Sequence, residues 1–237
     1  MTLRTTLVAS IAGILAGFAG GALALSGVVP MPHGASDAMV HDYILSHPEI
    51  LPEAIDKLRS ADAAKQVGAV RAVAEKPWPG AVMGNPDGKV VLVEFMDFAC
   101  GYCRQSLADV DRLVAANPDL KVVLRELPIL SPASVDAAKM ALAAGAQGKY
   151  GAFHHAMYDA GRPDAASIAD AAKKAGIDMT RAATTIASPQ AQAEIEGNLE
   201  MARKLGLNGT PSWIVGDRLL SGAVGYDALA QAIAAAR

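Results

Sequence analysis

Two cysteines, separated by two residues, are the groups in this sequence best suited to chemistry. Cys100 and Cys103 lie in the stretch EFMDFACGYCRQS (94–106), and the chain of 237 residues contains no other cysteine. A strand-like run ends just before the pair, and helical spacing begins just after it. The first cysteine is therefore expected at a helix N-terminus, where free N–H groups and the positive end of the helix dipole stabilise a thiolate.

The spacing of the pair predicts redox chemistry, with Cys100 as the attacking thiol and Cys103 as the resolving thiol one helical turn away. A structural zinc site needs four ligands, and the five histidines offer no complementary spacing. Haem attachment needs a histidine where Arg104 stands. A disulfide closing so short a loop contributes only about 2 kcal/mol, which makes a purely structural bridge a weak explanation. We therefore expect no metal and no cofactor.

The elements around the cysteines predict an α/β fold. A β-branched run, KVVLVEFMDF (89–98), is followed by helical spacing over 100–116 and by a second strand-like run, KVVLRELPIL (121–130). Strand, helix and strand at this length indicate a βαβ unit with parallel strands. Residues 133–206 have mostly helical patterns, and the chain ends with two short strands and a helix from about Tyr226.

A carboxylate on the first strand is a candidate for proton exchange. Strand alternation directs Glu94 away from the side of Val93 and Phe95, and predicts a place beneath the helix that carries the cysteines. Burial there would raise the pKa of Glu94 and allow it to move a proton during exchange. The alternative is a solvent-facing glutamate on a half-exposed strand. Asp97 is expected to be a surface or turn residue.

A proline directly before the penultimate strand is a candidate for substrate binding. In NGTPSWIV (208–215), Pro211 suits a cis peptide in a loop beside the active site. A cis-Pro211 would leave the backbone groups of Thr210 free to pair with a substrate chain. An ordinary trans turn proline is the alternative, and base rates favour it.

Three motifs, FMDFACGYC, LRELPILSPAS and GTPSWIVG, together resemble the DsbA-like branch of the thioredoxin superfamily over residues 76–237. The resemblance implies a thioredoxin fold with a helical insertion at about 133–206. It also implies active-site roles for Cys100, Cys103 and Glu94, and places the family's cis-proline at Pro211.

The sequence departs from the oxidases of that family at two places. The residues between the cysteines are Gly101 and Tyr102, and Thr210 precedes the proline, and both choices resemble those of disulfide isomerases. Tyr102 carries no positive charge, so the thiolate lacks one stabiliser and a less oxidising couple is expected.

The N-terminal 27 residues have the pattern of an export signal. Arg4 precedes the apolar run TLVASIAGILAGFAGGALALSG, and Ala22-Leu23-Ala24 suits a cleavage site. The apolar run from Thr5 to Val29 is also long enough to serve as a retained membrane anchor. Either outcome places the chain in the periplasm or another extracytoplasmic compartment, where disulfides persist.

Residues 28–75 are expected to form a helical arm. Leu51, Ile55 and Leu58 make a narrow apolar stripe that is too small for a core of its own. The stripe either packs on the main domain or on copies of itself, and the arm resembles that of ScsC-type proteins, which can oligomerise through it. A homo-oligomer is therefore a possible assembly.

The charge balance of the chain argues against a nucleic-acid partner, and the motifs are compatible with three functions. The net charge is −3, from 21 basic and 24 acidic residues, so nucleic acid is not expected to be a partner. The leading prediction is an exported thiol:disulfide oxidoreductase, most specifically an isomerase, that acts on cysteine-containing proteins. A membrane redox partner is expected to restore the redox state of its cysteine pair. The alternatives are a DsbA-type oxidase and, further off, a client-holding chaperone or Cu(I)-binding module.

Overall fold

The structure is a computed structural model that describes residues 33–237, so the signal or anchor predicted at 1–27 lies outside the described residues. The chain divides into two units, Met1–Asp56 and Lys57–Arg237. Within 33–237, no helix is both long enough and apolar enough to cross a membrane.

The described part of the first unit is helical. It contains α2 (His33–Ser46) and the first turns of α3 (Ile50–Ala74). Its large apolar side chains are about half exposed or more: Met39, Val40, Tyr43, Leu45, Leu51 and Ile55.

The second unit is built on a five-stranded sheet with the order β1-β3-β2-β4-β5. The strands are β1 (Val82–Gly84), β2 (Val90–Met96), β3 (Leu120–Glu126), β4 (Ser212–Val215) and β5 (Arg218–Ser221). β2 and β3 are parallel and are joined by α4 (Gly101–Ala116), which confirms the predicted βαβ unit. The remaining pairs are antiparallel. β1 has only three residues, too few for alternation to reveal it in the sequence.

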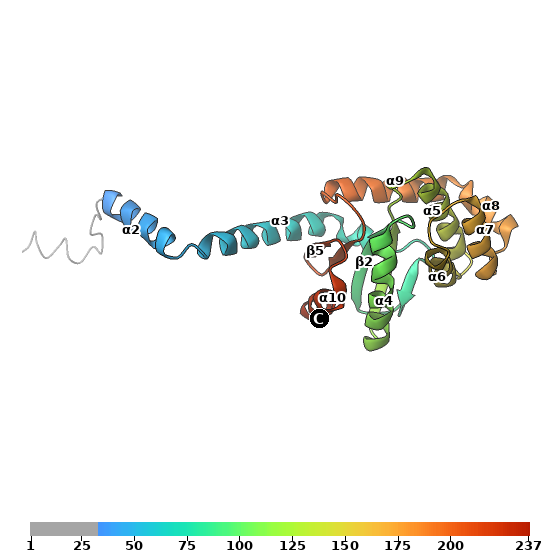
Figure 1. The fold of residues 1–237 in the computed structure, drawn as a ribbon, viewed down its shortest axis with the longest axis horizontal. Coiled ribbons are helices and arrows are strands. Elements are labelled where there is room, and N and C mark those ends of the chain that lie inside the picture. The colour runs from blue at the N-terminus through green and yellow to red at the C-terminus, as the bar shows by residue number, and fades with distance from the viewer. Residues whose placement is uncertain (1–32) are drawn as a thin grey trace, which may run out of the picture. The chain divides into compact units, whose positions relative to one another are not determined.

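Five helices between β3 and β4 form the expected helical insertion. They are α5 (Pro132–Gly145), α6 (Tyr150–Ala160), α7 (Ala165–Lys174), α8 (Met179–Ile186) and α9 (Pro189–Lys204), and α10 (Gly225–Ala235) closes the chain. Side-chain oxygens of Ser131, Asp164 and Ser188 accept backbone N–H groups at the starts of α5, α7 and α9. Figure 1 shows α5 to α8 gathered at one end of the sheet and α4 lying across β2.

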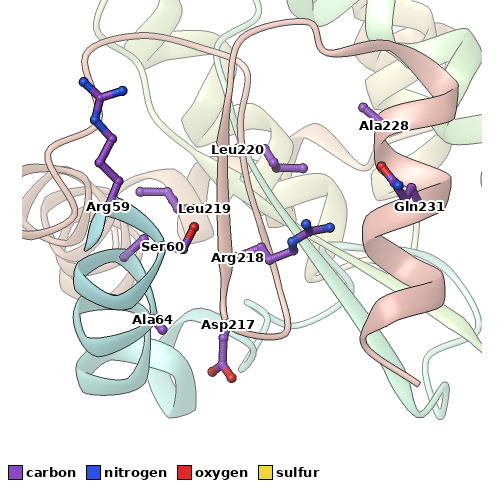
Figure 2. A pocket seen from close by; sticks show the side chains of 10 residues that line it. Arg59, Ser60, Ala64, Asp217, Arg218, Leu219, Leu220, Ala228 and Gln231 are labelled. Carbon is purple, nitrogen blue, oxygen red and sulfur yellow. The ribbon is translucent and has the colours of Figure 1, made fainter. Parts of the chain in front are cut away.

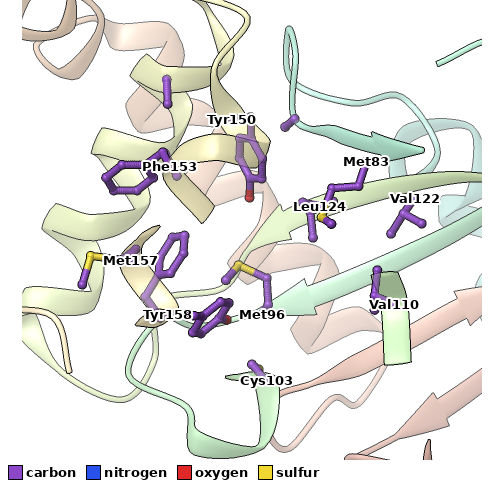
Figure 3. Packing of buried hydrophobic residues seen from close by; sticks show 14 of the residues in the cluster. Met83, Met96, Cys103, Val110, Val122, Leu124, Tyr150, Phe153, Met157 and Tyr158 are labelled. Atoms are coloured by element: carbon purple, nitrogen blue, oxygen red, sulfur yellow. The ribbon is translucent and has the colours of Figure 1, made fainter. Parts of the chain in front are cut away.

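Both faces of the sheet are covered, and they bury different charges. The face beneath α4 and its cysteines, called the thiol face here, packs against α4, α6 and α10. Its side chains are those of Leu92, Glu94, Met96, Leu124 and Glu126. Figure 3 shows part of this cluster, with Cys103 from α4, Met96 and Leu124 from the sheet, and Tyr150 and Tyr158 from α6. The opposite face, called the arginine face here after Arg125, packs against α9 and the end of α3. Its other side chains are those of Val93, Phe95 and Val123.

The end of α3 belongs to the core of the second unit. Val67 and Ala74 are fully buried in the cluster on the arginine face. Arg125 Nε donates a hydrogen bond of 3.1 Å to the carbonyl of Ala74. The predicted stripe of Leu51, Ile55 and Leu58 is itself exposed, and the packing on the sheet comes from residues further along α3.

Candidate active site

Cys100 is the N-cap residue of α4. Its backbone is extended (φ −82°, ψ 115°), its N–H donates to the Asp97 carbonyl at 2.9 Å, and its own carbonyl accepts from Arg104 N at 3.2 Å. Cys103 lies one turn later, and both cysteines are free thiols. Both thiols are buried, Cys100 with 6% of its surface exposed and Cys103 with 1%, while Tyr102 between them is 65% exposed. The pair therefore has an outer and an inner thiol.

The Thr210–Pro211 peptide is cis, as expected, and lies against the outer thiol. Cys100 Sγ donates to the Thr210 carbonyl at 3.1 Å. β4 begins directly after the proline and pairs with β2 through Ser212 and Phe95, which brings this loop to the end of β2. The predicted residues Cys100, Thr210 and Pro211 thus come together, although more than 100 positions separate them in the sequence.

The pKa of Cys100 is lowered to about 5. The hydrogen bond from the Cys103 thiol is the largest cause, and Thr210 and the backbone N–H groups of Cys103 and Tyr102 add to it, against the raising effect of burial. Once ionised, the sulfur can no longer donate to the Thr210 carbonyl. The buried Thr210 hydroxyl, which has no partner among the described residues, is then a suitable donor to the thiolate.

The two thiols differ sharply in acidity. Burial raises the pKa of Cys103, and the Cys100 and Glu94 side chains raise it further. Cys100 is therefore a thiolate at neutral pH while Cys103 keeps its proton and donates it in a hydrogen bond. This is the division between an attacking and a resolving thiol.

Glu94 is buried on the thiol face, 3% exposed, so the alternative of a solvent-facing side chain is wrong. Burial raises its pKa to about 8, and the negative charge of Cys100 contributes. Its neighbours across the strands are Leu124 and Trp213, neither of which can neutralise a carboxylate. A carboxyl in such a place changes protonation easily near neutral pH.

Asp97 lies in a turn, but the expectation of a surface position is wrong, since it is 1% exposed. Its carboxylate accepts three backbone N–H groups at 2.8–2.9 Å, those of Ala99, Ile129 and Leu130. These bonds join the turn before Cys100 to the loop between β3 and α5. Long-range hydrogen bonds of this kind leave no signal in a single sequence.

Glu126 is a second buried carboxyl that sequence reasoning missed. Its Oε1 accepts from the Tyr150 hydroxyl at 2.5 Å, and its buried Oε2 has no partner among the described residues. Burial raises its pKa well above the ordinary value, and burial likewise raises that of Tyr150. Alternation along LRELP, which places Glu126 two residues after buried Leu124, is the signal that could have found it.

Other clusters and cavities do not coincide with the thiols. No group of three or more histidine, cysteine or carboxylate side chains within 33–237 could hold a metal ion. Figure 2 shows a groove of about 480 Å³, with Arg59 and Ser60 of α3 on one side, Gln231 of α10 on the other and the β4–β5 hairpin between them. None of the predicted site residues lines this groove.

Two family models match the chain. The DsbA-like thioredoxin domain matches residues 91–234, which contain the cysteine pair, the helical insertion and the cis-proline. The N-terminal domain of the copper resistance protein ScsC matches residues 37–65, within α2 and α3.

Solved structures show the same fold. A thioredoxin-like oxidoreductase from Silicibacter pomeroyi is 42% identical, with a TM-score of 0.63 over 66% of this chain and 91% of that one. The thiol-disulfide exchange protein alpha-DsbA2 from Wolbachia pipientis is 29% identical, with a TM-score of 0.70 over 76% and 98%. A linker-deletion mutant of Proteus mirabilis ScsC is 28% identical, with a TM-score of 0.67 over 89% and 97%.

Curated relatives include a Na(+)/H(+) antiporter NhaA 1 from Salinispora arenicola, 28% identical over 158 residues, 65% of this chain. The chain spans about a quarter, 24%, of that protein's length. The DsbA-like model covers more than half of the chain, and the cysteine pair beside a cis-proline fits it. The chain therefore belongs to the DsbA-like thioredoxin family of disulfide oxidoreductases, and is similar to ScsC.

Proposed function

We propose that this protein is an exported disulfide isomerase that acts on disulfides of other proteins, with Cys100 as nucleophile and Cys103 as resolving thiol. One observation carries the proposal: Cys100 is the N-cap residue of α4, and its thiol has a pKa lowered to about 5 and touches the Thr210 carbonyl at 3.1 Å. An ionised thiol and a backbone edge for the substrate thus lie at one place.

In the first step, the Cys100 thiolate attacks one sulfur of a substrate disulfide. A bond forms between Cys100 Sγ and that sulfur, the substrate's S–S bond breaks, and the second substrate sulfur leaves as a thiolate that takes up a proton. The substrate chain pairs with the backbone of Thr210 beside Pro211. No net oxidation has occurred, because a disulfide has been exchanged for a mixed disulfide.

In the second step, either of two thiolates breaks the mixed disulfide. A different substrate thiolate can attack the substrate's sulfur, which releases Cys100 and completes an isomerisation. Otherwise Cys103 attacks Cys100 Sγ, the substrate leaves reduced, and the pair becomes a disulfide.

Glu94 suits the role of base for Cys103. The mixed disulfide removes the negative charge of Cys100, which is one of the two causes of the raised Glu94 pKa. Glu94 then ionises more readily, at the moment when the Cys103 proton needs an acceptor. The Glu94 carboxylate takes the proton, and the Cys103 thiolate attacks.

The residues around the pair favour an isomerase over an oxidase. Gly101 and Tyr102 separate the cysteines, and the phenol of Tyr102 carries no positive charge near the thiolate. DsbA-type oxidation remains the second candidate, since a stabilised thiolate favours the reduced form and makes the couple oxidising.

The arm supports an oligomer with several active sites. We propose residues 28–75 as the arm and 76–237 as the catalytic domain, with periplasmic localisation and a membrane redox partner. Exposed Leu51 and Ile55 lie within the segment that matches the ScsC N-terminal domain. Apolar side chains in such a stripe are commonly covered by other copies of the chain.

Trapping tests the exchange chemistry. Reduced Cys103→Ala should accumulate mixed disulfides with client proteins that carry non-native disulfides, such as scrambled RNase, because Cys100 attacks the client's S–S bond and nothing resolves the product. The control Cys100→Ala should accumulate none. A chaperone or Cu(I) module would hold clients without covalent capture, so the absence of mixed disulfides in Cys103→Ala would overturn the proposal.

Scrambled RNase tests isomerisation. The mature chain should restore RNase activity and have an oligomeric mass by light scattering. The Leu51→Asp/Ile55→Asp double variant should be monomeric and lose isomerase activity, while Cys100 alkylates at the wild-type rate. Lys65→Asp, an exposed polar change on the same helix, is the matched control. A monomeric wild-type chain without activity on scrambled RNase would leave oxidation as the better assignment.

A further inference from the structure

Two clefts adjoin the nucleophile. The smaller, of about 310 Å³, is lined by Asn208, Gly209, Thr210, Ser212, Ser221 and Gly222. The larger, of about 600 Å³, is lined by Ala99, Leu130, Ser131, Pro132, Ala133, Arg162 and Pro163, and is called the Arg162 cleft here. A neighbour of Cys100 lines each cleft: Thr210, whose carbonyl contacts Cys100 Sγ, lines the smaller, and Ala99, the residue before Cys100, lines the larger. A substrate chain bound at Cys100 therefore has the Arg162 cleft within reach.

The wall of the Arg162 cleft is apolar and firmly placed. Leu130 is 53% exposed although it is a large aliphatic side chain. The backbone N–H groups of Ile129 and Leu130 donate to the Asp97 carboxylate at 2.8 and 2.9 Å. The same carboxylate accepts from Ala99 N at 2.8 Å, so the wall and the turn before Cys100 are fixed to one buried group.

Arg162 is the one charged residue among those that line this cleft. It has no ion-pair partner within the described chain, and the nearby Asp164 carboxylate instead accepts from Ser167 N. The loop around it is ordered by local bonds: the Ser167 hydroxyl donates to the Arg162 carbonyl at 3.0 Å, and Gly161 takes a left-handed conformation at φ 95°. The backbone of Arg162 is thus fixed at the cleft, and its exposed guanidinium has no ion-pair partner among residues 33–237.

We infer that the Arg162 cleft binds the substrate polypeptide beside its reacting cysteine, and that it selects chains with an apolar residue and an acidic residue there. This specificity rests on the proposed exchange function of Cys100. The volume falls in the range of about 300–1,000 Å³ of ligand pockets and suits a few side chains. Leu130 and the prolines accept the apolar residue, and the Arg162 guanidinium pairs with the carboxylate.

The expected preference is modest because Arg162 is exposed. A solvent-exposed ion pair changes affinity by roughly two- to fivefold, and salt screens it. The preference should therefore appear in the rate of attack on a substrate, and should shrink as ionic strength rises. Since it concerns recognition, it should be absent for a small neutral disulfide.

A charge-swap experiment tests the inference. Single-cysteine peptides carrying a thionitrobenzoate leaving group are prepared with Glu, Gln or Lys at each position near the cysteine, and release of the chromophore by reduced full-length protein is followed. The wild type should react about two- to fivefold faster with Glu than with Gln at one or more positions, and slower with Lys. Arg162→Glu should reverse the order at those positions.

Two controls separate the charge at the cleft from other effects. Arg181→Glu makes the same change in net charge at an exposed arginine on α8 that does not line the cleft, and should keep the wild-type order. Hydroxyethyl disulfide, which is small and neutral, should react with the wild type and Arg162→Glu at equal rates. A separate variant tests the apolar part of the cleft: the wild type should react faster with peptides that have Leu, and not Ser, beside their cysteine, and Leu130→Ser should lose this preference.

The outcomes distinguish this inference from the proposed function. Equal rates for Glu, Gln and Lys peptides in the wild type, or an unchanged order in Arg162→Glu, would overturn the specificity and leave the exchange chemistry intact. If neither the peptides nor hydroxyethyl disulfide reacts at Cys100, the proposed function itself fails.

Discussion

The two faces of the sheet both bury charged residues, but only one face satisfies them. On the arginine face, the Arg125 guanidinium, 3% exposed, donates to the carbonyls of Val73, Ala74 and Lys76 and to the side chains of Glu194 and Asn198. On the thiol face, Glu94 and Glu126 are equally buried without a cation, and Glu126 Oε2 has no partner within the described chain.

The difference separates stability from reactivity. A buried charge with a full set of partners holds elements together, and its removal leaves those partners unsatisfied. A buried carboxyl without a cation has a raised pKa and changes protonation near neutral pH, which is useful beside a thiol that must lose a proton. Changes on the arginine face should therefore alter stability alone, whereas a change at Glu94 on the thiol face should also alter the exchange chemistry.

The largest effect is expected from Arg125→Met. The change leaves Glu194 unpaired and removes the donor to three carbonyls at the end of α3. The free energy of unfolding should fall by about 3–5 kcal/mol, measured by urea denaturation. The rate of Cys100 alkylation in the folded protein should not change. A loss below about 1 kcal/mol would mean that the buried network contributes little net stability.

Glu94→Gln should slow the step in which Cys103 resolves the mixed disulfide. Without a base for the Cys103 proton, the release of substrate from the mixed disulfide should slow by about 10²-fold at neutral pH. Formation of the mixed disulfide by Cys100 should slow far less. Stopped-flow measurement of both steps checks this, and an equal effect on both would argue against a role for Glu94 in resolution.

The same variant should change how stability depends on pH. The pKa of Glu94 is raised from 4.5 to about 8 in the folded reduced protein, so the folded state binds more protons than the unfolded state between these values. Glu94 therefore makes the wild type lose stability as pH rises through this window. The free energy of unfolding of Glu94→Gln, relative to that of the wild type, should increase as pH rises from about 4.5 to about 8. Below and above this pH range, the difference between the two proteins should be constant. A difference that does not vary with pH would contradict the raised pKa.

Tyr150→Phe should have a smaller effect on the thiol face. The Tyr150 hydroxyl is the donor to Glu126 Oε1 at 2.5 Å, and its loss leaves the whole carboxyl without a partner. Stability should fall by about 1–3 kcal/mol in urea denaturation. Glu126→Gln keeps an acceptor for Tyr150 and should cost less. A larger loss of stability in Glu126→Gln than in Tyr150→Phe would contradict this account of the Tyr150–Glu126 hydrogen bond.

The smallest effect is expected at the surface. Arg71 pairs with Asp217, whose side chain is 72% exposed. Arg71→Ala should change the free energy of unfolding by less than about 1 kcal/mol. This arginine, on the same helix that Arg125 holds, serves as the matched control for Arg125→Met in the same urea experiments. A loss as large as that of Arg125→Met would show that burial is not what distinguishes the two arginines.

The sequence predicted the site where local pattern was enough. The strand end followed by helical spacing placed Cys100 at a helix start, and alternation placed Glu94 beneath that helix. It did not predict the burial of Asp97, because two of the three N–H groups that bind its carboxylate come from Ile129 and Leu130, more than 30 positions away. The apolar stripe of the arm, Leu51, Ile55 and Leu58, was open to two interpretations, and its side chains are about half exposed or more. No sequence pattern indicated that the later part of α3, at Val67 and Ala74, packs on the sheet.

By itself, then, the sequence indicated a cysteine pair at the start of a helix and the βαβ unit around it, since both depend on neighbours within a few residues. Tertiary structure alone decided which buried charges are satisfied. Arg125 and Glu126 are adjacent in the sequence, yet strand alternation sends one to carbonyls of α3 and the other to Tyr150 of α6. Those partners come from segments about 25 to 50 positions away, and only the folded chain brings them within hydrogen-bond distance.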